Sequence, residues 1–148
     1  LKVKTATAGV EIIKTQELKI MFIAPNKDTY DDLNNHSAVL RIEYKDKVFL
    51  FMGDAEKESE DEITDDLKAD VIKVGHHGSD TSSSLKFANK VKPEYAIISV
   101  GEDNDYNHPS KNILNRWNLL GSKVYRTDIN GDIIITTDGY ELNIETAK

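Results

Sequence analysis

The sequence predicts a layered α/β domain in which strands alternate with helices through the middle of the chain. Three segments support this prediction, because 48–52, 71–74 and 95–100 are apolar runs of strand length, and each is followed by polar residues. Segments with helical spacing separate them, and short strands resembling a meander precede and follow this central part.

Length and composition are those of one folded domain, 1–148. Of the 148 residues, 39% are hydrophobic and 30% charged, which is typical of a globular protein with a real core. The net charge of −7 argues against a broad basic surface that grips phosphate backbones. Because the chain has no cysteine, a metal ion must be held by His, Asp, Glu or Asn side chains.

No run of 18 apolar residues occurs, so we expect no membrane-spanning segment within this chain. The chain begins at Leu1 without a methionine, which favours a fragment or a processed chain. Localisation is left open, with membrane association or export through segments outside this chain among the options.

The first third of the chain predicts extended structure. Strands are expected at 10–13 and 18–23, before a break at 24–28 and a polar loop at 31–36. The strands 37–44 and 48–52 are predicted to form an antiparallel hairpin that turns at Asp46 and Lys47.

The remainder predicts the alternation of helices and strands. A helix over 55–67 leads to strand 71–74, and a second helix, capped by Ser82 or Ser83, runs to Val91. After strand 95–100, Ser110 caps a helix that Gly121 closes. The chain is predicted to finish with short strands and tight turns, at 124–125, 133–136 and 140–144, with turns at 130–131 and 138–139.

Candidate functional side chains follow the three central strands. Asp54 comes after the first, the pair His76 and His77 after the second, and Asn104 and His108 after the third. If these strands are parallel neighbours, their carboxyl ends form one rim, which is where open α/β sheets bind ligands. A carboxylate with two or three imidazoles is the ligand set of a hydrolytic zinc or manganese site.

Each candidate also has a structural explanation. Asp54 could cap the helix that follows it, His36 could be a surface residue, and His108 could serve the structure of its loop. Ser79 and the hydroxyl residues after it could contact an anion, although helix capping is the simpler interpretation. Two adjacent histidines between glycines are poorly explained by packing alone.

Several motifs resemble the metallo-β-lactamase fold. They are Asn35-His36-Ser37-Ala38-Val39-Leu40, then Phe49-Leu50-Phe51-Met52-Gly53-Asp54, then Asp70-Val71-Ile72-Lys73-Val74-Gly75-His76-His77-Gly78-Ser79. With Asn104-Asp105-Tyr106-Asn107-His108-Pro109 added, the chain is most similar to the branch that contains the hydrolase domain of the competence DNA-uptake channel. The resemblance extends from about Asn34 to Gly139.

One departure from this family is clear. The early His-x-His-x-Asp-His loop, which supplies most ligands of both metals, is absent from this chain. The resemblance therefore implies the second half of an αβ/βα sandwich, with the N-terminal half of the same domain as its partner.

The resemblance also implies roles for individual residues. Asp54 would bridge two divalent metal ions, zinc or manganese, and take part in catalysis, with His77 as a ligand of the second ion. His76 would be catalytic and face the substrate phosphate or leaving group. His36 would be a further ligand, and the substrate side would be lined by Asn104, His108 and Ser79.

The resulting hypothesis is part of a metal-dependent phosphodiesterase or nuclease, linked to DNA uptake. The isolated chain is expected to bind metal partially or not at all and to be weakly active or inactive. A chain without its partner half would expose an apolar sheet face, so it could dimerise.

The alternative from a different class is a non-catalytic binding or assembly module that retains the fold. An unrelated α/β phosphate binder is disfavoured, because no glycine-rich loop ending in Lys-Ser or Lys-Thr occurs.

Overall fold

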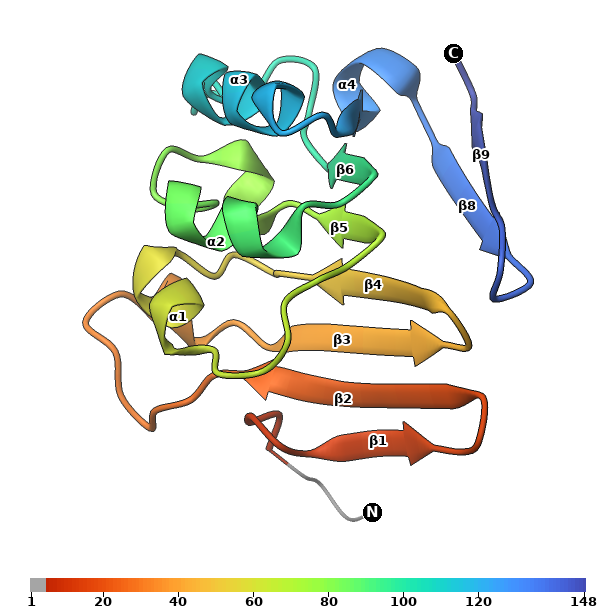
Figure 1. Cartoon of the computed structure of the whole chain (residues 1–148). Helices are drawn as coiled ribbons and strands as arrows, with labels where there is room; N and C mark the ends of the chain where they lie inside the picture. The colour runs from red at the N-terminus through yellow and green to blue at the C-terminus, as the bar shows by residue number, and fades with distance from the viewer. Residues whose placement is uncertain (1–4) are drawn as a thin grey trace.

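A seven-stranded mixed sheet organises residues 5–148, the part of the chain that the computed structural model describes (Figure 1). The strands lie side by side in chain order, from β1 to β7. The first four are antiparallel neighbours: β1 (Glu11–Lys14), β2 (Leu18–Ala24), β3 (Val39–Tyr44) and β4 (Lys47–Phe51). The hairpin expected from the pattern of residues 37–52 is thus confirmed.

The other half of the sheet is parallel. It joins β4 to β5 (Val71–Lys73), β6 (Tyr95–Ile98) and β7 (Lys123–Arg126). Leu50 is paired with Ile72, which is paired in turn with Ala96. The carboxyl ends of β4, β5 and β6 therefore meet at one edge, as the sequence predicts.

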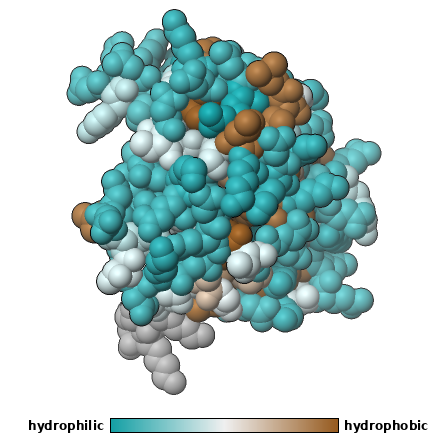
Figure 2. All heavy atoms as spheres, turned by 60° about the vertical axis from the view of Figure 1, so that its left-hand side comes forward, coloured by the Kyte–Doolittle hydropathy of each residue, from teal (hydrophilic) through white to brown (hydrophobic). Residues whose placement is uncertain are grey.

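Helices cover one face of this sheet (Figure 1). They are α1 (Lys57–Glu62), α2 (Leu85–Val91) and α3 (Lys111–Leu119), with the short α4 (Thr127–Asn130) after β7. Leu50, Ile72, Ile98 and Trp117 are fully buried between the helices and the sheet. Viewed from this side, the surface is mainly hydrophilic, with small separate groups of hydrophobic residues (Figure 2). None of the helices in residues 5–148 is long and apolar enough to cross a membrane.

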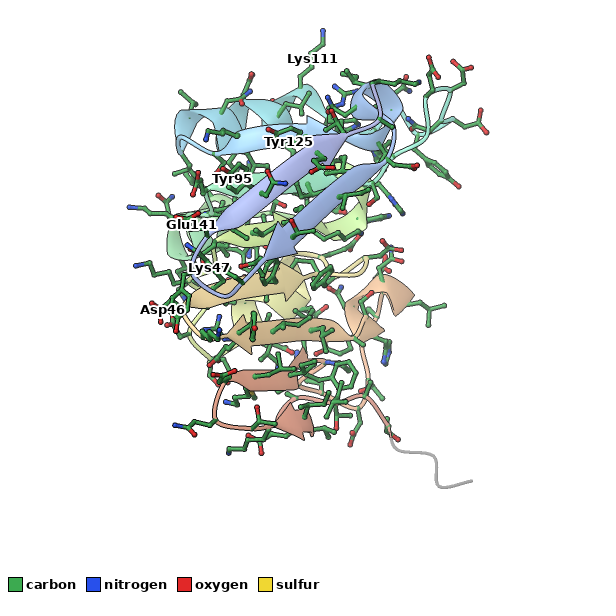
Figure 3. The ribbon with its side chains drawn as sticks, turned by 90° about the vertical axis from the view of Figure 1, so that its right-hand side faces the viewer. Asp46, Lys47, Tyr95, Lys111, Tyr125 and Glu141 are labelled. Carbon is green, nitrogen blue, oxygen red and sulfur yellow. The ribbon has the colours of Figure 1, made fainter. Side chains whose placement is uncertain are left out.

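A hairpin of β8 (Ile133–Thr137) and β9 (Leu142–Thr146) lies on the opposite face. Seen face on, it crosses in front of the parallel strands and leaves β1 to β3 uncovered (Figure 3). Ile133 and Ile135 line a hollow of about 270 Å³ together with residues of β4, β5 and β6, among them Phe51 and Ile97.

The uncovered part of this face is apolar. Phe22 is paired with Leu40, and Ile20 with Ile42, so these side chains project from the same side of the sheet. All four are only half-buried, and Phe51 in β4 is 40% exposed. Exposed apolar surface of this kind is typical of an interface.

Two predicted helix ends differ from the structure. The helix expected over 55–67 spans only α1, because the backbone is already extended at Ile63 (φ −66, ψ 118). Asp65 and Asp66 follow, and negative charge at a helix C-terminus opposes the helix dipole. The cap of α2 is Ser84, whose hydroxyl accepts a hydrogen bond from the N–H of Phe87, and not Ser82 or Ser83.

The tight turn expected at 130–131 also differs from the structure. Residues 130–131 end the short helix α4, and β7 is paired with β6 rather than with β8. The Thr127 hydroxyl donates to the carbonyl of Val100, which ties α4 to the end of β6. The turn at 138–139 is confirmed between β8 and β9.

Candidate functional site

Asp54 lies just beyond β4, at the edge where the parallel strands end. Its backbone N–H donates a 3.0 Å hydrogen bond to the Ser37 hydroxyl. Gly53 has a positive φ of +58°, and a Cβ at this position would lie 3.0 Å from the Cβ of Ser37. The segment before β3 therefore packs directly on this turn and fixes it. The Asp54 side chain is 43% exposed, so a ligand can reach the carboxylate.

The half-buried cation of Lys73, in β5, contacts the same turn. Its ammonium donates a 3.2 Å hydrogen bond to the carbonyl of Gly53. Burial lowers the pKa of the Lys73 ammonium, and the negative charge of Asp54 acts in the opposite direction. Sequence reasoning did not select Lys73 because it is one charged residue within the apolar run 71–74.

The two histidines occupy an unusual backbone turn, Gly75–Gly78. Both residues are left-handed, His76 with φ 45 and ψ 47 and His77 with φ 52 and ψ 22. Each costs about 1–2 kcal/mol relative to a right-handed conformation, and such strain clusters at functional sites. The turn is held by its neighbours, since the N–H of His76 donates to the carbonyl of Gly53 (3.0 Å) and the Ser82 hydroxyl to that of Gly75 (2.8 Å).

His77 faces Asp54. Its Nδ1 donates a 2.6 Å hydrogen bond to the carbonyl of Ser99 at the end of β6, because a carbonyl oxygen can only accept. The other ring nitrogen, Nε2, lies 3.5 Å from Oδ1 of Asp54. This hydrogen bond leaves Nε2 unprotonated in the neutral ring, as metal ligation requires.

The separation of these two atoms suits a shared metal ion. For tetrahedral zinc with metal–ligand distances of about 2.1 Å, two ligand atoms lie about 3.4 Å apart. The 3.5 Å between Nε2 and Oδ1 matches this spacing. Within residues 5–148, however, no group of three or more His, Asp or Glu side chains is arranged to hold a metal ion. Asp54 and His77 thus have the spacing of two ligands of one ion, and residues 5–148 add no third side chain to them.

His76 points to different partners. Its Nδ1 lies 3.1 Å from Oε1 of Glu56 and 3.3 Å from the hydroxyl of Thr81. The Thr81 hydroxyl also donates a 2.7 Å hydrogen bond to Glu56. The left-handed backbone at both positions directs the rings of His76 and His77 apart, and their centroids are 6.4 Å apart. The two rings therefore contact different groups.

The ring of His108 lies next to that of His76, with the two centroids 5.8 Å apart. It lines both a cleft of about 770 Å³ and a hollow of about 210 Å³ that also reaches His77. The exposed ring of Tyr106 lies nearly parallel to it at 5.8 Å. Burial lowers the pKa of the His108 imidazole, and the nearby His76 and His77 lower it further.

The side chains of the remaining candidates, Asn104, Ser79 and His36, form hydrogen bonds with neighbouring residues of the protein. Both ends of the Asn104 amide bond its own loop, since it donates to the carbonyl of His108 and accepts from its N–H (both 2.8 Å). The buried Ser79 hydroxyl contacts Thr81 at 3.0 Å. The ring of His36 accepts a 3.3 Å hydrogen bond from the N–H of Tyr30, and the structure does not group it with Asp54 and His77.

Sequence reasoning missed Glu56 and the role of Asn35. Glu56 stands in an acidic stretch of the sequence, 54–66, whose usual interpretation is a solvated helix face, yet its side chain is only 13% exposed. Asn35 is buried, and its Oδ1 accepts hydrogen bonds from the N–H groups of Glu56 (3.1 Å) and Ser59 (3.2 Å). The available signal was the position of Glu56, two residues after Asp54 at the same rim.

The loop that carries His108 is joined to the histidine turn. The N–H of Ser110 donates a 2.9 Å hydrogen bond to the carbonyl of Gly78, and a Cβ on Gly78 would lie 2.6 Å from that of Pro109. Gly78 also has a positive φ of +80°. Only glycine allows this close approach, which fixes His108 next to His76.

Comparison with known proteins gives a consistent assignment. A model of the "Metallo-beta-lactamase superfamily" matches residues 16–102, which include Asp54, His76 and His77. The chain is 36% identical over 126 residues to ComE operon protein 3 of Bacillus subtilis, covering 83% of this chain and 16% of that protein. It is 39% identical over 114 residues to competence protein ComA of Neisseria gonorrhoeae, covering 74% of this chain and 16% of that protein.

Another relative is recombination protein 2 of Haemophilus influenzae, which is 32% identical over 134 residues. The alignment covers 90% of this chain and 17% of that protein. The chain therefore spans about a sixth of the length of these relatives.

Proposed function

Because the chain belongs to the metallo-β-lactamase superfamily, we propose that it is part of a metal-dependent hydrolase that cleaves phosphodiester bonds, with DNA as the favoured substrate. The observation that carries this proposal is the 3.5 Å separation between Nε2 of His77 and Oδ1 of Asp54. Two of the relatives are named for a competence protein and a recombination protein. These names support a role in competence, linked to the uptake of DNA.

In this proposal Asp54 and His77 would be the residues of this chain that hold divalent metal, zinc or manganese. A bound ion supplies Lewis-acid polarisation of the phosphoryl oxygen and a water of lowered pKa. The hydrogen bond from His77 to the Ser99 carbonyl keeps its Nε2 aimed at Asp54.

The neighbouring imidazoles act on the substrate. The Nδ1 side of His76 is occupied by Glu56 and Thr81, which leaves Nε2 for the substrate. In the neutral ring Nε2 carries the lone pair and would accept a proton as a general base, whereas in the imidazolium it would donate to a phosphate oxygen or give its proton to the leaving group. His108 lines the adjoining cleft, whose volume of about 770 Å³ accommodates a nucleotide-sized group. Asn104 supports this cleft by holding the backbone of His108.

We also propose that the chain forms the second half of its catalytic domain. The half-buried apolar side chains on the uncovered face of β2 and β3 support this proposal, since a second layer would bury them. That layer would come from an N-terminal half with the His-x-His-x-Asp-His loop, which would complete the ligand set. Alone, the chain should bind metal weakly and turn over slowly.

The decisive experiment measures phosphodiesterase activity of the full-length protein with zinc or manganese. We expect Asp54→Ala and His77→Ala to lower kcat/KM at least 100-fold. The control Asp46→Ala removes an exposed carboxylate at the turn between β3 and β4, at the opposite end of β4, and should leave the rate unchanged. Wild-type activity of Asp54→Ala would remove Asp54 from the mechanism.

A non-catalytic binding or assembly module is the second candidate. It is favoured by the incomplete ligand set of residues 5–148 and by the open apolar face. Absence of hydrolysis by the full-length protein with either metal, together with loss of assembly in Phe51→Asp, would support it. Sedimentation of the isolated chain tests whether this face forms a dimer, and a monomer at all concentrations would contradict dimerisation.

A further inference from the structure

We propose that Glu56 is a positioning residue that fixes the tautomer and the orientation of the His76 ring. Oε1 of Glu56 lies 3.1 Å from Nδ1 of His76 and holds this nitrogen in its protonated form. The other nitrogen, Nε2, then carries the lone pair of the neutral ring. The catalytic consequence of this arrangement rests on the function proposed above, whereas the tautomer itself does not.

The donors and acceptors around His76 determine which nitrogen is protonated. An ionised carboxylate only accepts hydrogen bonds, so Glu56 requires a donor on each partner. The Thr81 hydroxyl gives its one hydrogen to Glu56 (2.7 Å) and can only accept from other groups. Nδ1 of His76 thus faces two acceptors, Oε1 of Glu56 and Oγ1 of Thr81, and must carry the hydrogen.

The Glu56 carboxylate is itself held in place. The N–H of Glu56 donates to the buried Oδ1 of Asn35, and the N–H of Lys57 donates to the carbonyl of Thr81 (3.0 Å). The first bond ties the start of α1 to the segment before β3, and the second ties it to the segment that follows the histidine turn. Within residues 5–148, no lysine or arginine forms an ion pair with Glu56, and its one ion-pair partner is His76.

A purely structural role does not explain Glu56. Its side chain makes no capping bond to α1, because Asn35 caps this helix instead. Glu60, on the same helix, shows what a structural carboxylate does here, since it is buried and accepts hydrogen bonds from the N–H groups of Ser83 and Ser84. Glu56 instead directs its carboxylate to a side chain at the rim of the sheet.

The tautomer can be read directly from the nitrogen-15 spectrum of the histidine side chains of the full chain. Wild type should show His76 protonated at Nδ1. Glu56→Ala should replace this state with a mixture of tautomers, whereas Glu56→Gln keeps an acceptor oxygen and should retain it. Glu58→Ala is the matched control, because Glu58 lies on α1 and pairs with Lys27 at 3.1 Å.

The catalytic consequence is measured in the full-length protein. Loss of a residue that orients an active-site imidazole typically costs about 10- to 100-fold. We expect Glu56→Ala to lower kcat by this factor with KM nearly unchanged, Glu56→Gln to restore most of it, and Glu58→Ala to match wild type.

Each result has one meaning. A single Nδ1-protonated His76 in Glu56→Ala overturns the proposal, as does unchanged kcat in Glu56→Ala when His76→Ala is impaired. If His76→Ala also retains full kcat, the catalytic role proposed for His76 fails, and the tautomer measurement still decides whether Glu56 positions the ring.

Discussion

Asn35→Ala tests the link between the segment before β3 and the rim of the sheet. Asn35 is 2% exposed, and its Oδ1 accepts from the N–H groups of Glu56 and Ser59 at 3.1 and 3.2 Å. It therefore caps α1 from outside the helix, where no side chain of the helix itself does so. Alanine at position 35 would remove the acceptor of both backbone N–H groups, those of Glu56 and Ser59.

The expected loss follows from these two bonds. Removing a helix cap costs about 1 kcal/mol, and leaving a further buried donor unsatisfied costs about 1–3 kcal/mol. Asn35→Ala should therefore lower the free energy of unfolding by about 2–4 kcal/mol in total. With a urea m-value of about 2 kcal/mol/M, the unfolding midpoint should fall by about 1–2 M.

Urea denaturation followed by circular dichroism measures this shift. The control Asn34→Ala removes a neighbouring amide whose contact with Oε1 of Glu56 is long, at 3.5 Å. This change should lower the free energy of unfolding by less than about 0.5 kcal/mol. Asn35→Asp keeps an acceptor oxygen and should recover most of the stability. A midpoint for Asn35→Ala equal to that of Asn34→Ala would refute the capping role.

Further stability predictions concern buried, strained and charged positions. Trp117 is fully buried, and its indole N–H has no hydrogen-bond partner among residues 5–148, so Trp117→Ala should cost about 3–5 kcal/mol and Trp117→Phe less, as thermal unfolding will show. Gly78→Ala forces a left-handed alanine against Pro109 and should cost about 2–4 kcal/mol, against about 1–2 kcal/mol for Gly121→Ala, which has a similar φ and open space. Lys57 and Lys86 hold the pKa of the Asp61 carboxyl down to about 2, below its ordinary 3.8. The ionised carboxylate therefore stabilises the folded protein above pH 4, and this contribution is lost as the pH falls from 4 to 2. Because Asp61 is near the surface, Asp61→Asn should cost less than about 1 kcal/mol at neutral pH and nothing at pH 2, measured by urea denaturation at both.

The rim of candidate side chains could be predicted because its signal is local. Each of β4, β5 and β6 is a short apolar run, and polar residues follow where the run ends. Parallel neighbours then bring Asp54 and the histidine pair to one edge without further information.

The partners of these side chains could not be predicted in the same way. Asn35 and Glu56 are separated by 21 residues, and their contact depends on how the segment before β3 packs on the turn after β4. In sequence, Glu56 belongs to an acidic run whose usual interpretation is a solvated helix face. No residue pattern signals two successive left-handed histidines, because this conformation is imposed by the surrounding hydrogen bonds.

Zinc titration of the chain, followed in the nitrogen-15 spectrum of its four histidines, tests most directly whether Asp54 and His77 share a metal ion. The structure predicts that Nε2 of His77 shifts at a lower zinc concentration than any other ring nitrogen, and that Asp54→Asn moves this shift to a higher concentration. A first response at another histidine, or a response of His77 that Asp54→Asn leaves unchanged, would contradict the shared site.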